Sequence, residues 1–121
     1  MKKTELGAWG EDRAAALLEQ EGYRIRGRNF RCRFGEIDLI AEKENVLAFV
    51  EVKLRKSSRH GEAREFVTAS KQQKLRTTAS FYLAGHAWAQ ACQPRFDVLE
   101  IYAPQGPDGP VSMEHLTDAF E

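Results

Sequence analysis

Three charged residues interrupt apolar stretches of this chain. Asp38 lies within EIDLIA (36–41), and Glu51 and Lys53 lie within VLAFVEVKLR (46–55). Burying a charge costs several kcal/mol unless the charge is paired or binds a metal ion. Two carboxylates suit Mg²⁺ or Mn²⁺, and a lysine beside them can stabilise developing negative charge. These three residues are therefore the first candidates for chemistry.

A hairpin between the two stretches would bring the carboxylates together. With Glu44 and Asn45 at the tip of a two-residue turn, facing residues have numbers that sum to 89, so Asp38 faces Glu51. Facing residues point to the same side with Cβ atoms roughly 5 Å apart, and Lys53, two residues on, shares that side. A slip of one residue would separate the carboxylates. This register predicts a metal ion between Asp38 and Glu51, with Lys53 stabilising an oxyanion or positioning the attacking water.

Glu11 is a candidate third carboxylate and metal ligand. In the helix expected over 5–21, it lies at the edge of the apolar stripe, from which it can face the sheet. The alternative for Glu11 is an ion pair with an arginine on the helix surface. For Asp38, Glu51 and Lys53, the alternative is a structural salt bridge on a solvated face, because two acids and a lysine form a short, degenerate pattern.

The formal charges cancel over the whole chain, with 18 Lys+Arg and 18 Asp+Glu, but they are unevenly distributed. Residues 24–76 hold 14 Lys+Arg and 7 Asp+Glu, whereas the segment beyond Arg95 holds six acidic residues and no Lys or Arg. Arginine donates paired hydrogen bonds to phosphate, so basic clusters around an acidic site favour DNA or another nucleic acid as partner over a merely solvated surface. The residues expected to contact it are Arg24, Arg26, Arg28, Arg31, Arg33, Arg55, Lys56, Lys71 and Lys74. Phe30, among these arginines, is a candidate for stacking on a base.

Length and composition exclude several classes of protein. A chain of 121 residues fits a single domain, 1–121, with its own hydrophobic core. The longest uncharged apolar run near its middle, 46–50, is far too short to cross a bilayer, and the N-terminus does not resemble a signal peptide. Cys32 and Cys92 are far apart and form no C-x-x-C, so we expect both to be reduced. We therefore expect a cytoplasmic protein with no membrane partner.

The apolar patterns predict two helices and at least four strands. A second helix is expected from an N-cap at Thr68 over 69–84, or as far as 91. The expected strands are 23–28, 36–41, 46–55 and 95–102, with loops at 57–65 and 103–110. The last segment, 111–120, is a strand or a helix. The order α-β-β-β-α-β predicts an α/β fold, with a mixed central sheet flanked by helices.

The chain resembles the YraN family of uncharacterised bacterial proteins over nearly its whole length. The resemblance lies in GAWGEDRAAALLEQEGYRIRGRNFRCRFGEIDLIA, LAFVEVKLR, VTASKQQKLRTTASFYL, RFDVLEI and EHLTDAF. That family is similar to the restriction-endonuclease-like superfamily, whose motif is PD-(D/E)-x-K, and within it to archaeal Holliday junction resolvases. Asp38, Glu51 and Lys53 match the acidic pair and the lysine of the motif, although Ile37 stands where the motif has proline.

This resemblance implies a restriction-endonuclease-like core and a nuclease that uses Mg²⁺ or Mn²⁺ to hydrolyse DNA, with structured or branched DNA as the substrate. Glu11 matches the helix-1 glutamate of resolvase-like members, and Lys71 or Gln72 stands where some members carry a further site residue. Resolvase-like relatives act as dimers, which implies a homodimer. The alternative function is a catalytically silent module that binds nucleic acid or another partner on the same fold.

Overall fold

The computed structural model describes residues 3–56 and 67–120. Its elements are α1 (Lys3–Gln20), β1 (Arg24–Cys32), β2 (Gly35–Lys43), β3 (Val46–Arg55), α2 (Ala69–Gly85), the 3-10 helix η2 (Ala87–Ala91), β4 (Gln93–Tyr102) and β5 (Ser112–Phe120). The five strands form one sheet in the order β1-β2-β3-β4-β5. Strands β3 and β4 are parallel, with α2 between them in the chain, and the other neighbours are antiparallel.

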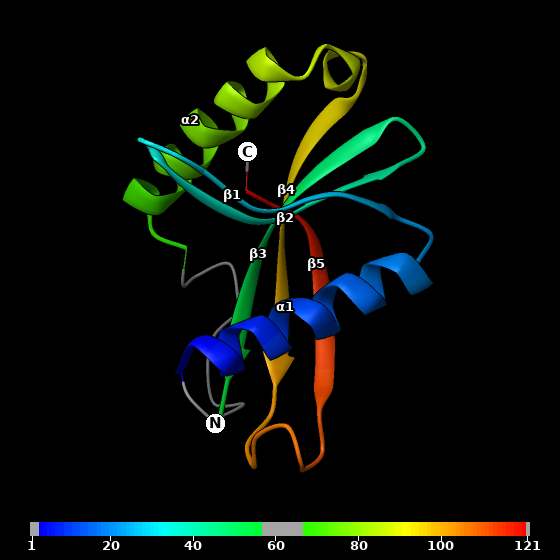
Figure 1. The fold of residues 1–121 in the computed structure, drawn as a ribbon, viewed down its shortest axis with the longest axis vertical. Helices are drawn as coiled ribbons and strands as arrows, with labels where there is room; N and C mark the ends of the chain where they lie inside the picture. The colour runs from blue at the N-terminus through cyan, green and yellow to red at the C-terminus, as the bar shows by residue number, and fades with distance from the viewer. Residues whose placement is uncertain (1–2, 57–66, 121) are drawn as a thin grey trace.

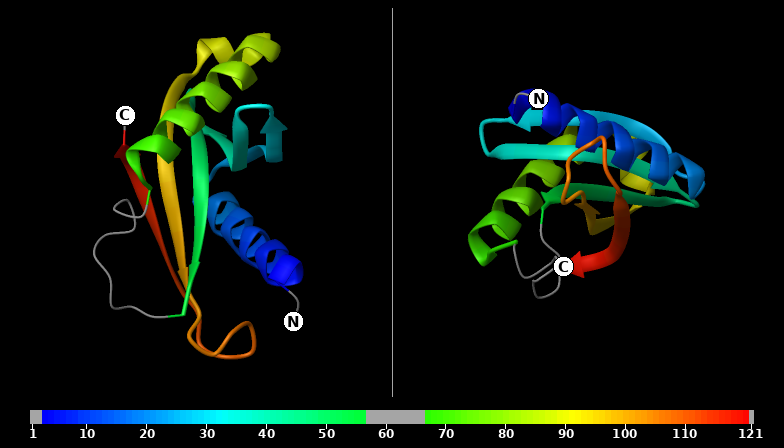
Figure 2. Two further views of the ribbon diagram at one scale, coloured as in Figure 1. Left: turned by 90° about the vertical axis from the view of Figure 1, so that its left-hand side faces the viewer. Right: turned by 90° about the horizontal axis from the view of Figure 1, so that it is seen from below.

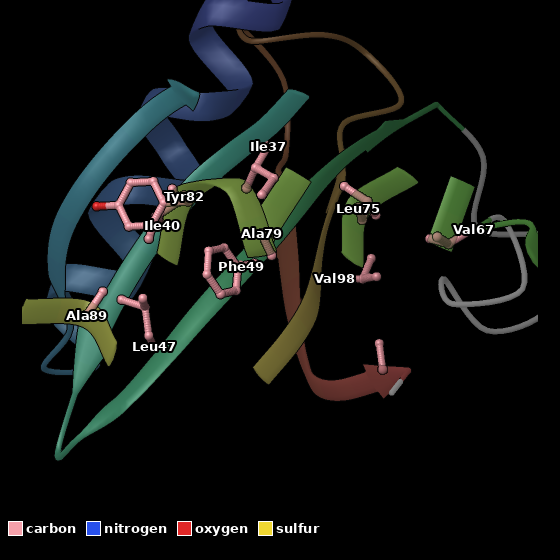
Figure 3. Close-up of a cluster of buried hydrophobic side chains, with 11 residues drawn as sticks. Ile37, Ile40, Leu47, Phe49, Val67, Leu75, Ala79, Tyr82, Ala89 and Val98 are labelled. Carbon is pink, nitrogen blue, oxygen red and sulfur yellow. The ribbon is translucent and has the colours of Figure 1, made fainter. Parts of the chain in front are cut away.

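The two long helices lie on opposite faces of the sheet (Figures 1 and 2). On one face, α1 packs Ala14 and Leu18 against alternate residues of the central strands, such as Leu39 and Val50. On the other face, α2 and η2 cover a second apolar cluster (Figure 3). The members of that cluster labelled in the figure are Ile37, Ile40, Leu47, Phe49, Val67, Leu75, Ala79, Tyr82, Ala89 and Val98. Strand β3 is therefore buried on both faces, which explains its nearly continuous apolar sequence.

The α/β fold predicted from the sequence is confirmed, with differences at the ends of elements. Strand β1 continues to Cys32, beyond the predicted end at Arg28, because its pairing with β2 runs on to Cys32↔Gly35. Helix α2 begins after Thr68, whose side chain accepts a hydrogen bond from Lys71 N at 3.1 Å, as expected for an N-cap. The helix ends at Gly85, and 87–91 form the separate η2.

The final segment, open between strand and helix in the sequence, forms β5 at the edge of the sheet. The polar loop predicted at 57–65 lies outside the described residues. No helix in the parts of the chain that are described is both long and apolar enough to cross a bilayer.

Candidate active site

The sheet forks between β2 and β3. The two strands leave a turn in which Glu44 and Asn45 have φ values of 51° and 66°, the left-handed pair that a tight hairpin requires. Backbone pairing runs from Lys43↔Val46 to Leu39↔Val50, which is the predicted register. Beyond that point β2 pairs only with β1, and β3 pairs only with β4. The strands then diverge (Figure 1), so Asp38 and Glu51, which the sequence predicted to pair, lie just past the last backbone pair. We call this divergence, with Asp38, Glu51 and Lys53, the fork.

Asp38 spans the gap at this fork. Its Oδ2 accepts a hydrogen bond from the backbone N–H of Val52 at 2.8 Å, so the side chain takes the place of a backbone carbonyl. Burial and the neighbouring carboxylate of Glu51 raise the pKa of Asp38 from 3.8 to about 7, although the bond from Val52 acts in the opposite direction. Glu11 and Glu36 raise this pKa further. The fork therefore holds a carboxyl group that gives up its proton near neutral pH, and a bound cation would favour that loss.

Glu51 is buried, with 8% of its surface exposed, and its Oε1 lies 2.7 Å from Nζ of Lys71 on α2. Burial acts to lower the pKa of Lys71, but the hydrogen bond to Glu51 outweighs it and the pKa lies above its usual value. Lys53 lies two residues beyond Glu51, and burial and the Lys71 ammonium lower its pKa. The fork thus brings two carboxyl groups and two lysine amines close enough together for their charges to interact.

A cavity of about 210 Å³ opens beside these groups. Its lining comes from the start of β2, from β3 and from the first half of α2, and consists of Gly35, Glu36, Asp38, Glu51, Lys71, Lys74 and Leu75. A water molecule occupies about 30 Å³ in the liquid, so the space suits a hydrated ion or a phosphate group. The close approach of Gly35 to α2 shapes one wall, because a Cβ there would lie 3.0 Å from Oγ1 of Thr78.

Glu11, on α1, is linked to the fork by a hydrogen bond with Asn29, a residue that sequence reasoning did not identify. Its Oε1 accepts a hydrogen bond from Nδ2 of Asn29 at 2.9 Å. Asn29 lies between the pairs Arg28↔Leu39 and Phe30↔Ile37, so β1 places it opposite Asp38. Its φ of 51° is a conformation that asparagine tolerates better than most residues. An asparagine inside a run of arginines was the available sign that β1 is irregular at this point.

The carboxylates nearest the cavity form a pair rather than a ready-made metal cluster. Over residues 3–56 and 67–120, no three His, Cys, Asp or Glu side chains are close enough together to hold a metal ion. Magnesium is usually held by one or two carboxylates and several water molecules. Asp38 and Glu51 fit that requirement, and the role of Glu11 as a third ligand stays a prediction.

The arginines predicted to bind nucleic acid are not all available at the surface. Arg55 is buried, and its Nε lies 2.8 Å from Glu100 Oε2, so it is the least suited to phosphate. Arg26 pairs with Glu42 and Arg28 pairs with Asp12, at 2.7 and 2.6 Å.

The remaining basic residues fall into two groups. Lys71 and Lys74 line the cavity. Arg31 and Arg33 lie at the β1–β2 turn next to it, where Arg31 pairs with Glu36 at 3.1 Å and Arg33 lies 4.9 Å from the ring centre of Phe34. Arg24 is exposed at the start of β1, and Lys56 is exposed just after the end of β3. The basic surface that can act together with the fork is therefore Arg31, Arg33, Lys71 and Lys74.

A second group of buried charges, absent from the sequence predictions, joins β4 to β5. Asp97 is 1% exposed and accepts two hydrogen bonds from Arg95, at 2.8 and 2.7 Å, and one from the backbone N–H of Asp118 at 3.0 Å. His115 Nε2 lies 2.7 Å from Asp97 Oδ2, and its Nδ1 lies 2.7 Å from Glu21 Oε1 at the end of α1. We call these residues the β4–β5 cluster. Every oxygen of its central carboxylate is occupied.

The family model described as "Uncharacterised protein family UPF0102" matches residues 10–101. This chain belongs to UPF0102. A UPF0102 protein of Symbiobacterium thermophilum is 47% identical over 115 residues, which cover 95% of each chain. One from Caldicellulosiruptor saccharolyticus is 44% identical over 102 residues, covering 84% of this chain and 86% of its own. UPF0102 is the YraN family, so the resemblance to that family is confirmed. The part matched to UPF0102 contains the fork and Glu11, whereas His115 and β5 lie beyond it.

Proposed function

We propose that this UPF0102 chain is a divalent-metal-dependent nuclease that hydrolyses phosphodiester bonds in DNA, with structured or branched DNA as its substrate. The observation that carries the proposal is the arrangement at the fork. Two carboxylates, Asp38 and Glu51, share a small cavity with lysine ammonium groups, and the proton of Asp38 is held to about pH 7. Like charges held together at this cost are typical of a site that receives a cation.

Asp38 and Glu51 are the residues that would hold Mg²⁺ or Mn²⁺. When bound, the ion would supply a Lewis acid for the phosphate and for water. The backbone N–H of Val52 donates a hydrogen bond to Asp38 at 2.8 Å, and Lys71 donates one to Glu51 at 2.7 Å. These bonds fix the orientation of the two carboxylates. Orientation of ligands by neighbouring hydrogen bonds is a general requirement of such sites.

Lys53 supplies positive charge or a hydrogen bond at the reacting phosphate. It follows Glu51 on the same side of β3, and burial together with Lys71 lowers its pKa. A lysine so placed can donate to the oxygens on which charge develops, or orient the attacking water. Lys74, which lines the cavity, provides charge that attracts the DNA backbone without reading its sequence.

The decisive experiment is cleavage of linear, flapped and four-way DNA with Mg²⁺ or Mn²⁺ by the wild type and by Asp38→Asn, Glu51→Gln and Lys53→Met. Glu19→Gln, an exposed residue of α1, is the matched control for removal of a negative charge. We expect each fork variant to cut about 100-fold more slowly or worse, and the control to cut like the wild type. Cutting that survives the fork substitutions would overturn the proposal. Salt-sensitive binding with no cutting by the wild type would instead favour a silent binding module. A homodimer, as in resolvase-like proteins, is part of the same proposal and is checked by the mass of the protein in solution.

A further inference from the structure

A second concave surface lies beside the fork, between the β1–β2 turn and the second half of α2. It has a volume of about 790 Å³. Phe30 and Phe81 contribute aromatic surface to its lining, and Arg31 and Arg33 contribute guanidinium groups. No acidic residue lines it within the described parts of the chain. We call this surface the aromatic groove.

Two neighbouring phenylalanine rings are open to solvent here: Phe81 lines the groove, and Phe34 lies beside Phe81 on the β1–β2 turn. Phe34 is 39% exposed and Phe81 is 48% exposed, and their ring centres lie 5.7 Å apart. Among the described residues, Trp88 in η2 is the third large hydrophobic side chain with comparable exposure, and its ring lies near Tyr82 and His86 rather than near this pair. The core does not need an exposed pair of rings, and such a pair is typical of a binding surface.

The charges around the rings indicate the chemistry of the ligand. Arg33 lies 4.9 Å from the centre of the Phe34 ring, and Arg31 is 74% exposed although it pairs with Glu36. A groove that offers flat apolar faces and guanidinium groups complements a ligand with flat rings and negative charge. Unpaired nucleotides meet both requirements, because their bases stack on aromatic rings while their phosphates pair with arginine. A continuous duplex does not, since its base faces are covered by stacking.

The position of the groove connects it to the fork. Phe81, in the groove, and Lys74, in the cavity of the fork, are seven residues apart on α2, which corresponds to about 10 Å along the helix. That distance equals about three stacked nucleotides at 3.4 Å each. The β1–β2 turn also borders both spaces, through Arg33 on one side and Gly35 on the other. A strand held in the groove can therefore run directly into the fork.

We propose that the aromatic groove binds the unpaired bases of a DNA strand and so directs the fork to junctions between single-stranded and duplex DNA. The inference rests on the proposed nuclease function and names its substrate class. In this arrangement, Phe34 and Phe81 stack on bases, and Arg31 and Arg33 contact the adjoining phosphates.

The test separates binding from cutting. Affinity for a fluorescent oligothymidine and for a duplex of the same length is measured in EDTA, at one salt concentration, for the wild type and for a Phe34→Ala/Phe81→Ala double variant. We expect single-strand affinity to fall about tenfold or more, with duplex affinity changed less than twofold. Ser80→Ala, at an exposed residue of α2 that does not line the groove, is expected to bind like the wild type and controls for damage to α2.

Unchanged single-strand affinity in the double variant, or an equal loss of duplex affinity, would overturn the groove assignment. Its failure is distinct from failure of the nuclease proposal, because no metal ion is present and no bond is cut. If the wild type binds single strands through the groove but cuts no DNA with either metal, the groove assignment stands and the nuclease proposal is wrong.

Discussion

The fork and the β4–β5 cluster are both groups of charged side chains within one sheet, but their charges are arranged in opposite ways. In the β4–β5 cluster, the buried Asp97 lies between Arg95 and His115, and its oxygens accept hydrogen bonds at 2.7–3.0 Å. At the fork, Asp38 and Glu51 lie beside each other, and the pKa of Asp38 rises to about 7.

In the β4–β5 cluster, hydrogen bonds between opposite charges outweigh the effect of burial on the pKa values. Burial acts to raise the pKa of Asp97, but the hydrogen bonds from His115 and Arg95 outweigh it and the pKa lies below its usual value. Burial acts to lower the pKa of His115, but its bonds to Asp97 and Glu21 raise it. Opposite charges therefore stabilise each other here, which is what a structural link between strands requires.

The difference suggests a rule for interpreting buried charge in this chain. A cluster whose groups satisfy one another stabilises the fold. A cluster that places like charges together next to a cavity lowers the free energy of unfolding, but it provides a site that can bind a cation. Removal of the Asp97 carboxylate and removal of the Asp38 carboxylate should therefore change the free energy of unfolding with opposite signs.

The largest expected effect is the loss of Asp97. We expect Asp97→Ala to lower the free energy of unfolding by about 3–5 kcal/mol, because Arg95 and His115 would lose their shared partner inside the sheet. Urea denaturation followed by circular dichroism measures the change. Glu114→Ala, exposed on β5, is the control and should stay within about 0.5 kcal/mol of the wild type. A loss below about 1 kcal/mol for Asp97→Ala would remove the distinction between the clusters.

The same kind of substitution at the fork should have the opposite sign. In metal-free buffer at pH 8, we expect Asp38→Asn to raise the free energy of unfolding by about 2 kcal/mol, because a carboxylate beside Glu51 is replaced by a neutral amide that can still accept from Val52. The folded pKa, about 7, lies above the ordinary 3.8, so ionising Asp38 destabilises the fold as pH rises between these values. The gain should therefore disappear near pH 4. Destabilisation at pH 8 would show that the carboxylate is a structural element.

Within the fork, Glu11 and Glu51 should differ in how strongly each contributes to metal binding. It touches Asn29 rather than the two central carboxylates, so we expect Glu11→Gln to weaken Mn²⁺ binding about tenfold and Glu51→Gln to weaken it more. Titration of metal-free protein with Mn²⁺ measures both affinities. Equal losses in the two variants would make Glu11 a direct ligand.

The smallest expected effect is the pH dependence of His115. Its raised pKa means that its stabilising bonds are fully present below pH 6.5 and are lost as pH rises through the folded value. The destabilisation caused by His115→Gln should therefore shrink by about 1 kcal/mol between pH 6 and pH 9. Comparing variant with wild type at each pH cancels the contribution of Asp38. A difference that does not change with pH would mean that His115 is neutral throughout.

The sequence was sufficient to predict the register of β2 with β3, because the relevant information is local. Two residues at the hairpin tip set the register, and charges inside apolar strands identify Asp38 and Glu51. The divergence of β2 from β3, which gives Asp38 its bond to Val52, depends on the neighbours of both strands and could not be predicted. Asn29 was missed for the same reason, because only the pairing of β1 places it opposite Asp38.

The β4–β5 cluster was beyond sequence reasoning. Its members come from the end of α1, from β4 and from β5, and Glu21 and His115 are 94 residues apart. The final strand itself was open between strand and helix, so no partner for Asp97 could be named. Local charge counts also failed for Arg55, which the pairing of β3 with β4 places near Glu100 inside the structure.

The most direct test of the metal site is calorimetric titration of the metal-free protein with Mn²⁺ at pH 7, in two buffers of different ionisation enthalpy. For the wild type we expect one ion per chain and a net release of protons, because the raised pKa of Asp38, about 7, leaves part of the protein protonated there at this pH. For Asp38→Asn we expect affinity at least tenfold lower and no such proton release. A wild type that binds no Mn²⁺, or an Asp38→Asn protein that binds it equally well, would contradict the assignment of the fork as a metal-dependent active site.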